Sequence, residues 1–199
     1  MLLAYQLIIS FFLIVSPIII LYRLNKNKED PKRYKEKFAL PSKRRFKGKL
    51  IWFHGASVGE ILSIIPIIKN YEKNKKINQI LITSSTLSSS KILNKFKFKK
   101  TIHQFYPIDH FLFTDKFLKF WKPNLAVFID SEIWPYMFNQ IHKMNIPLVL
   151  LNARLSKKTS DRWLKIRFIA KLIFEKITIA YPQNIETNTF LKRIKTTYR

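Results

Sequence analysis

The sequence predicts an α/β fold, a Rossmann-like parallel sheet with helices on both faces, preceded by an amino-terminal membrane-anchor helix. Short apolar runs rich in Ile, Val, Leu and Phe alternate with longer segments of helical character, as expected for parallel strands joined by crossover helices. Residues 2–22 carry no charged side chain. Hydrophobic residues make up 47% of the 199-residue chain and aromatic residues 15%, which supports a substantial core and excludes a disordered basic tail.

The composition narrows the classes of partner and site. Lys and Arg number 37 against 12 Asp and Glu, a formal net charge of +25 that favours phosphates in lipid, sugar or nucleic acid. We expect no nucleic-acid partner, because no groove-reading or RNA-stacking motif is present and an anchor is at odds with that role. Cysteine is absent, which excludes disulfides and Cys-ligated metals. The four His residues lack the i, i+4 spacing of a helical metal site, so we expect no metal.

The first 22 residues are predicted to form the membrane anchor. At about 1.5 Å per residue, a helix of this length crosses a hydrocarbon core of about 30 Å. No basic residue precedes the apolar run, and bulky or charged residues follow it, which favours a retained anchor over a cleaved signal peptide. Gln6, Ser10, Ser16 and Pro17 interrupt the run. A full span and a shallow monotopic insertion therefore both stay open.

Residues 23–48 are predicted to be a basic juxtamembrane linker. Lys and Arg dominate this stretch, and its acidic residues are Glu29, Asp30 and Glu36. Positive flanks stay on the cytoplasmic side of a membrane and attract anionic headgroups. We therefore expect the chain to lie at the inner (cytoplasmic) membrane, with the remaining residues on its cytoplasmic face against an anionic surface.

Residues 49–199 are predicted to form one Rossmann-like domain. The expected strands are the apolar runs Lys49–Phe53, Asn78–Thr83, His103–Tyr106, Leu125–Ile129 and Pro147–Leu151, with a sixth strand from Ile177–Ala180. The expected helices between them are Ser57–Tyr71, Ser88–Phe96, Phe111–Trp121, Trp134–Met144 and Asp161–Phe174. In such sheets, ligands bind beyond the carboxyl ends of the strands. The loops after the first, second, fourth and fifth strands are therefore the candidate sites.

The loop after the first strand reads HGASVGE, from His54 to Glu60. Its small residues allow close approach of a ligand, and the helix that begins at Ser57 points free N–H groups toward a phosphate or carboxylate. Ser57 and Gly59 are candidate binding residues. Glu60 has two interpretations: it completes a Ser-x-x-Glu capping box, or it is a catalytic base. A GxGxxG motif is absent, so this loop is not a common dinucleotide cradle.

The loops after the second and fourth strands also carry polar groups. The second holds a dense run of hydroxyls, with Ser84 as the candidate; these residues either cap a helix and contact solvent or surround a sugar or phosphate. The fourth places Asp130 and Glu132 two residues apart in a chain with only 12 acidic residues. These two are candidate site carboxylates, or they stabilise a helix amino terminus.

The loop after the fifth strand sets Asn152, Arg154 and Ser156 at the same edge of the predicted sheet. This combination suits an anionic ligand, because a guanidinium forms strong charge-assisted hydrogen bonds to carboxylates and phosphates. The alternative is a helix cap with a surface salt bridge.

Five segments resemble, in order and spacing, the 3-deoxy-D-manno-octulosonic acid (Kdo) transferases of lipopolysaccharide synthesis. They are HGASVGE at 54–60, YPID at 106–109, DSEIWP at 130–135, NARLS at 152–156 and QN at 183–184. The resemblance runs from the anchor to about residue 190 and matches the amino-terminal half of that family. It implies a membrane-associated glycosyltransferase of the two-domain type B fold. That enzyme transfers Kdo from CMP-Kdo to a lipid A precursor, lipid IVA, with inversion and with no metal or other cofactor.

The resemblance also implies roles for individual residues. Glu60 stands at the position of the general base, and Asp130 at that of a transition-state stabiliser which is normally glutamate. Asp130 is one methylene shorter, and a loss of about 1 Å in reach can cost about 10²-fold in rate. The second loop departs from the family as well, with Leu87 and Ser88 in place of a Thr- and Gly-containing pattern. The implied substrate-binding residues are Ser57, Gly59, Ser84, Glu132, Asn152, Arg154 and Ser156.

The family's second domain, which binds the CMP part of the donor, would follow Arg199 and is absent from this sequence. We therefore expect the acceptor-binding half of the enzyme, with CMP-Kdo binding dependent on the missing domain. Two alternatives stay open: a catalytically inactive membrane-bound binding remnant, and one half of a split enzyme whose partner is a separate carboxy-terminal half.

Overall fold

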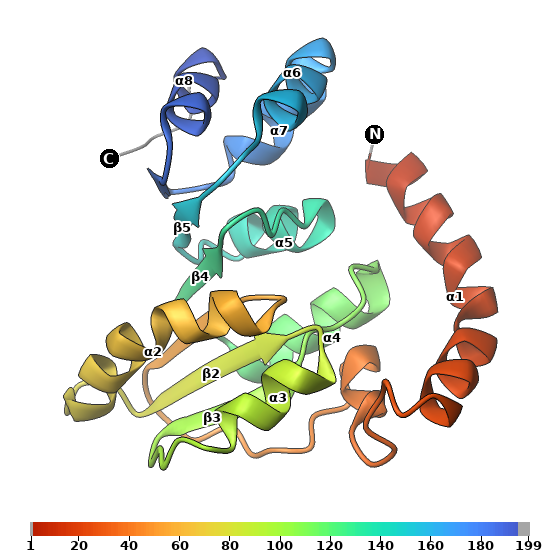
Figure 1. The fold of residues 1–199 in the computed structure, drawn as a ribbon, viewed down its shortest axis with the longest axis vertical. Helices are drawn as coiled ribbons and strands as arrows, with labels where there is room; N and C mark the ends of the chain where they lie inside the picture. The colour runs from red at the N-terminus through yellow and green to blue at the C-terminus, as the bar shows by residue number, and fades with distance from the viewer. Residues whose placement is uncertain (1, 195–199) are drawn as a thin grey trace.

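The computed structural model describes residues 2–194 of the chain. Residue 1 of the predicted anchor and residues 195–199 of the predicted domain lie outside the described residues. The body is a six-stranded parallel sheet of order β3-β2-β1-β4-β5-β6, which confirms the predicted Rossmann-like fold (Figure 1). The strands are β1 Leu50–His54, β2 Gln79–Ser84, β3 Thr101–Phe105, β4 Leu125–Ile129, β5 Leu148–Ala153 and β6 Ile179–Pro182.

Helices cover both faces of the sheet because successive strand residues point to opposite sides. Leu50 and Trp52 of β1 pack into one core, with side chains of α4 (Phe111–Trp121), α5 (Pro135–Lys143), α7 (Arg167–Phe174) and α8 (Ile185–Arg193). Ile51 and Phe53 pack into the other, under α2 (Val58–Lys73) and α3 (Leu87–Leu93). The central strands β1, β2 and β4 are buried on both faces, which explains why their sequences are almost continuously apolar.

The last third of the domain differs from the prediction at one helix and contains another helix that was not predicted. The single helix predicted at Asp161–Phe174 is two helices, α6 (Lys157–Lys165) and α7, separated at Ile166. Helix α6 begins earlier than predicted because Ser156 caps it, accepting a hydrogen bond from the Thr159 amide. The break turns the chain so that Trp163 and Phe174 meet, with ring centroids 5.6 Å apart. Helix α8, capped by Asn184, is not among the predicted helices.

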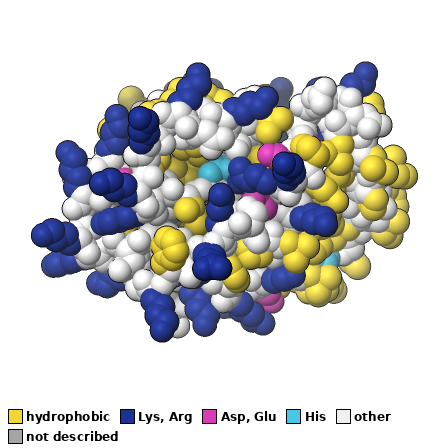
Figure 2. Space-filling model, turned by 90° about the horizontal axis from the view of Figure 1, so that it is seen from below, with side chains coloured by type: hydrophobic (Ala, Val, Ile, Leu, Met, Phe, Trp, Pro, Cys, Tyr) yellow, Lys and Arg dark blue, Asp and Glu magenta, His cyan; other side chains and the backbone are white. Residues whose placement is uncertain are grey.

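The amino-terminal helix α1 spans Leu2–Asn25 and lies along one side of the body (Figure 1, red). It is long and apolar enough to cross a membrane. Many of its large apolar side chains are exposed, among them Phe11, Ile14 and Ile18. In Figure 2, hydrophobic side chains gather along the edge where α1 lies, while Lys and Arg side chains are spread over the rest of the face. The exposed apolar side chains and the basic side chains are therefore concentrated on different parts of this face.

The basic segment after α1 packs against the sheet edge through its acidic residues. Glu29 is 4% exposed and pairs with Arg23 and Lys37, at 2.6 and 2.5 Å. Glu36, in the 3-10 helix η1 (Tyr34–Phe38), is 2% exposed and accepts a 2.7 Å hydrogen bond from the Phe105 amide of β3. The stretch predicted as a linker thus carries buried contacts with the domain.

Candidate active site

The candidate site lies at the carboxyl edge of the sheet, where the strand order reverses. β1 pairs with β2 on one side and with β4 on the other, so the loops after β1 and β4 leave the sheet next to each other. This topological switch point is where open α/β sheets bind ligands. The loops predicted from the sequence therefore lie where the fold concentrates helix amino termini.

Ser57 caps α2 as predicted, and Glu60 folds back on the turn in a variant of the predicted capping box, because its backbone donor is Ala56, one residue before the N-cap. Ser57 Oγ accepts from the Glu60 amide at 3.3 Å and donates to Glu60 Oε1 at 2.7 Å. The Ala56 amide donates to Glu60 Oε2 at 2.8 Å. The side chain nevertheless stays partly exposed. Capping and proton abstraction are therefore compatible, since the donors fix the position of the carboxylate while leaving it partly exposed at the edge of the site.

Gly55 fixes how close this carboxylate lies to the turn. A Cβ at this position would approach Glu60 Cβ to 3.1 Å and Ile61 Cδ1 to 3.4 Å. The turn therefore leaves little room for a side chain at Gly55. Gly59 is more open, because its nearest contact for a Cβ is Ser57 Oγ at 3.9 Å. Ser57 and Gly59 are both exposed.

Glu132 is held by residues from two other parts of the site. His54 Nε2 lies 3.1 Å from its Oε2, and the Trp134 indole N–H donates to the same oxygen at 2.9 Å. His54 is fully buried and also contacts Thr83 Oγ1 at 2.9 Å. Burial alone would raise the pKa of Glu132. The hydrogen bonds and charge of His54, together with Trp134, outweigh burial and lower that pKa.

Asp130 occupies a strained position at the end of β4. Its φ is 61°, in the left-handed region, which Asp and Asn tolerate better than most residues. Its Oδ1 is buried without a hydrogen-bond partner among the described residues. Burial raises the pKa of Asp130, the Arg154 charge opposes this shift and the Glu132 charge adds to it. The carboxyl of Asp130 thus lies between the Arg154 and Glu132 charges at this edge, with one oxygen buried.

The candidates predicted in the fifth loop lie at the same edge: Asn152 is inside the last part of β5, and Arg154 and Ser156 follow the strand. Asn152 has a φ of 57° and is partly exposed, and Arg154 is exposed. Ser131 of the fourth loop donates to the Arg154 carbonyl, which joins the two loops. Ser156 is exposed and caps α6, so the predicted cap and the predicted site residue coincide.

Ser84 differs from the other candidates in being completely buried. Its Oγ lies 2.8 Å from His103 Nε2, beneath the surface of the second loop. The neighbouring Ser85 is partly exposed, whereas Ser89 and Ser90 are buried. The structure therefore gives Ser84 a structural partner and offers no support for ligand contact by its hydroxyl.

Three aromatic residues that were not predicted as site residues, His54, Tyr106 and Trp134, pack against one another beneath the site loops. The rings of Tyr106 and His54 stack with centroids 3.9 Å apart, and Tyr106 and Trp134 lie at 4.9 Å. Burial, with the nearby charges of Asp109 and Glu132, raises the pKa of Tyr106. These residues occur within the motifs quoted above, but only the fold brings them together.

An open cavity of about 260 Å³ borders the site on the side of α1. Its apolar walls come from Ile9 of α1, Pro107, Ile108 and Trp134. Lys37 and Ser85 add polar groups at its lining. The cavity thus lies between the apolar helix α1 and the loop that carries Glu132.

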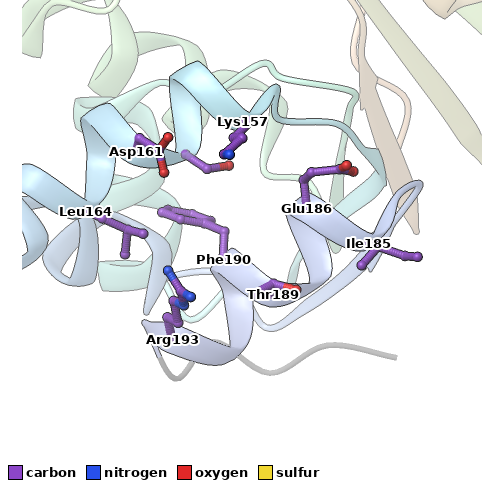
Figure 3. A pocket seen from close by; sticks show the side chains of 9 residues that line it. Lys157, Asp161, Leu164, Ile185, Glu186, Thr189, Phe190 and Arg193 are labelled. Atoms are coloured by element: carbon purple, nitrogen blue, oxygen red, sulfur yellow. The ribbon is translucent and has the colours of Figure 1, made fainter.

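A second cavity, of about 210 Å³, lies between α6 and α8 (Figure 3). Lys157 and Asp161 approach it from α6, and Glu186 and Arg193 from α8. Its lining includes none of the predicted site residues. Within residues 2–194, no three His, Asp or Glu side chains gather in a way that could hold a metal ion.

Comparison with known proteins places the chain in a family. The family model described as 3-deoxy-D-manno-octulosonic-acid transferase (kdotransferase) matches residues 32–198. A 3-deoxy-D-manno-octulosonic acid transferase of Rickettsia bellii is 40% identical over 177 residues, which cover 88% of this chain and 42% of the relative. That of Rickettsia felis is 36% identical over 237 residues, covering 94% and 50%. A probable mitochondrial one of Arabidopsis thaliana is 39% identical over 152 residues, covering 75% and 34%.

The chain spans half or less of the length of these relatives. The family match nevertheless extends over most of the chain and includes every loop of the candidate site. On this evidence, together with the parallel sheet and the capping-box glutamate at its switch point, the chain belongs to the 3-deoxy-D-manno-octulosonic acid transferase family of glycosyltransferases.

Proposed function

We propose that this chain is the acceptor-binding half of an inverting Kdo transferase that moves Kdo from CMP-Kdo to the lipid A precursor lipid IVA. The observation that carries the proposal is the placement of Glu60. Its carboxylate accepts from the Ser57 hydroxyl and the Ala56 amide while remaining partly exposed at the switch point of the sheet. Inversion needs such a carboxylate within hydrogen-bond reach of the attacking hydroxyl.

In the proposed reaction, Glu60 takes the proton of the acceptor sugar hydroxyl. The hydroxyl oxygen forms a bond to the anomeric carbon of Kdo as the bond from that carbon to the CMP phosphate breaks. Positive charge develops on the Kdo ring, and Asp130 lies at the same edge to stabilise it. The position of Asp130 directly after β4, beside the loop that carries Glu132, supports this role. We expect the reaction to need no metal.

Substrate binding is assigned to the exposed polar groups around these carboxylates. Arg154 is the exposed cation of the fifth loop and suits an anionic group of the substrate, with Asn152 and Ser156 beside it. Ser57 and Gly59 present the amino terminus of α2. Glu132 orients the loop through His54 and Trp134. Ser84 reaches the substrate only if the second loop moves, because its hydroxyl is engaged with His103.

A lipid acceptor fits the surroundings of the site. The exposed apolar face of α1 suits hydrocarbon. The cavity between Ile9 and Trp134 is open to an acyl chain beside the loop after β4, residues 130–134, which we call the acceptor loop. The net charge of +25 favours the phosphates of the lipid A precursor and an anionic leaflet. We place the chain on the cytoplasmic face of the inner membrane. A donor-binding domain, in the same or a separate chain, is expected to hold CMP-Kdo.

The test is transfer of labelled Kdo, from CMP-Kdo generated in situ, to lipid IVA by the purified chain in detergent micelles, with and without a donor-binding half from a Rickettsia relative. Glu60→Gln should lower transfer by about 10²- to 10⁴-fold. Glu186→Gln is the matched control, since Glu186 is also a glutamate in the first turn of a helix but lies outside the site. Transfer that is unchanged in Glu60→Gln would refute the assigned base. If no combination transfers Kdo, yet the folded chain binds lipid IVA, the alternative of an inactive binding remnant is favoured.

A further inference from the structure

Helix α1 contacts the domain through a row of polar side chains near its amino terminus. Tyr5 Oη donates to Asp109 Oδ2 at 2.8 Å. Gln6 Nε2 donates to the Asp109 carbonyl at 3.2 Å, and Gln6 Oε1 accepts from the Phe111 amide at 2.8 Å. Ser10 Oγ lies 3.0 Å from His110 Nε2. This part of the helix is therefore attached to specific groups of the domain, although its length and composition are those of a membrane helix.

Asp109 connects these contacts to α5. Its Oδ1 accepts from the Met137 amide at 2.7 Å and its Oδ2 from the Tyr136 amide at 3.0 Å. The side chain of Trp134, the residue at the N-cap of α5, makes no capping hydrogen bond within the described residues. Asp109, which is 1% exposed, therefore caps α5 from a different segment of the chain, in place of the residue at the N-cap. The start of α5 thus depends on a carboxylate that α1 also holds.

The same helix start carries the acceptor loop. Pro135 is the first residue of α5, and Trp134 directly before it donates to Glu132. Glu132 in turn contacts His54, at the end of β1 and directly before the Glu60 turn. A continuous series of hydrogen bonds and one short chain segment therefore leads from Tyr5 to the candidate active site.

We propose that Asp109 is a positioning residue through which docking of α1 sets the conformation of the acceptor loop, so that α1 is part of the framework of the site as well as its membrane anchor. Burial raises the pKa of the Asp109 carboxyl to about 6, because water no longer solvates the ionised form. The hydrogen bonds from α5 and Tyr5 oppose this cost. Loss of the Tyr5 donor should therefore weaken the whole cap. The link between docking and catalysis depends on the proposed function, but the physical coupling does not.

The coupling is tested by nuclear magnetic resonance on the full chain in detergent micelles, without any transfer assay. The variant is Tyr5→Phe, which removes one hydroxyl. Its matched control is Tyr22→Phe on the same helix, because Tyr22 is 59% exposed. We expect Tyr5→Phe to shift the Trp134 indole resonance and to speed hydrogen exchange of the Tyr136 and Met137 amides about tenfold. The indole resonance of Trp121 should stay in place.

Two outcomes overturn the proposal. One is Tyr5→Phe with the Trp134 resonance and both amide exchange rates at wild-type values. The other is an effect of the same size in Tyr22→Phe, which would indicate a general loss of helix stability. Asp109→Asn identifies the route: if it alters α5 while Tyr5→Phe does not, Asp109 is a cap that works independently of the anchor. Because none of these measurements uses Kdo transfer, they stand whether or not the chain is active.

Discussion

Burial of the Asp109 carboxyl should make the chain less stable as the pH rises, and Asp109→Asn should remove this dependence. Burial raises its pKa from 3.8 to about 6, against the opposing hydrogen bonds. Between these two pH values the folded chain keeps a proton that the unfolded chain has lost. Folding is therefore favoured at low pH, and this contribution declines as the pH rises through the pKa of the folded state. The groups around the carboxyl are Tyr5, Tyr106, Thr114 and the amides of Tyr136 and Met137.

The size of the effect follows from the shift. At about 1.4 kcal/mol per pKa unit, a change from 3.8 to about 6 corresponds to about 3 kcal/mol over the full titration. About 2 kcal/mol of this falls between about pH 4.5 and about pH 7, since the unfolded carboxyl is already largely ionised at the lower limit. Asparagine does not titrate. The loss of the cap in Asp109→Asn therefore changes the unfolding free energy by the same amount at every pH. The contribution of the titrating carboxyl is the part of the difference that varies with pH.

The assay is urea unfolding in detergent micelles at several pH values, with the difference in unfolding free energy between wild type and Asp109→Asn plotted against pH. We expect this difference to fall by about 2 kcal/mol, in the direction that makes the wild type relatively weaker at neutral pH. Asp161→Asn, at an exposed position, controls for the loss of one negative charge. A difference that is flat, or that rises with pH, would refute the burial argument.

Three further predictions concern the loops and the last helix. Gly55→Ala should push Glu60 from its position, because the new Cβ lies 3.1 Å from Glu60 Cβ; transfer should fall about tenfold or more with little loss of stability, and unchanged transfer would contradict this. Arg154→Ala should raise the pKa of Asp130 further by removing the opposing charge, so the acidic limb of the pH–rate profile should move to higher pH; a shift to lower pH would show the opposite coupling. Asn184→Ala should lower the unfolding free energy by about 1 kcal/mol through loss of the cap of α8, measured by urea unfolding; no change would mean that the cap is dispensable.

The strands were predictable because burial on both faces leaves a strong signal. Runs such as LIWF at 50–53 and LAVF at 125–128 are buried throughout or nearly so, and few other structures accommodate such sequences. The break at Ile166 was not predictable, because apolar residues continue on both sides of it and no Gly or Pro marks it. Helix α8 is marked locally by its Asn184 cap, a signal that the sequence carries.

The site was predictable in its loops but not in its connections. Glu60 could be placed at a helix start from the spacing to Ser57 alone. The contact of His54 with Glu132 joins residues 78 positions apart, and that of Tyr5 with Asp109 joins residues 104 apart. No local pattern specifies such pairs, since they depend on strand order and on where a helix docks. Burial of Ser84 likewise follows from its place inside β2.

The left-handed backbone at Asp130 limits how this position can change in evolution. Its neighbour across the sheet edge, Asn152, has the same conformation, with φ values of 61° and 57°. Asp and Asn enter this conformation more readily than other non-glycine residues. Substitution by glutamate would lengthen the side chain by one methylene and would place a less tolerant residue at a φ of 61°. The residue at position 130 thus determines both the reach of the carboxylate and the strain of the backbone. A longer carboxylate at this position comes with higher strain unless the turn after β4 also changes.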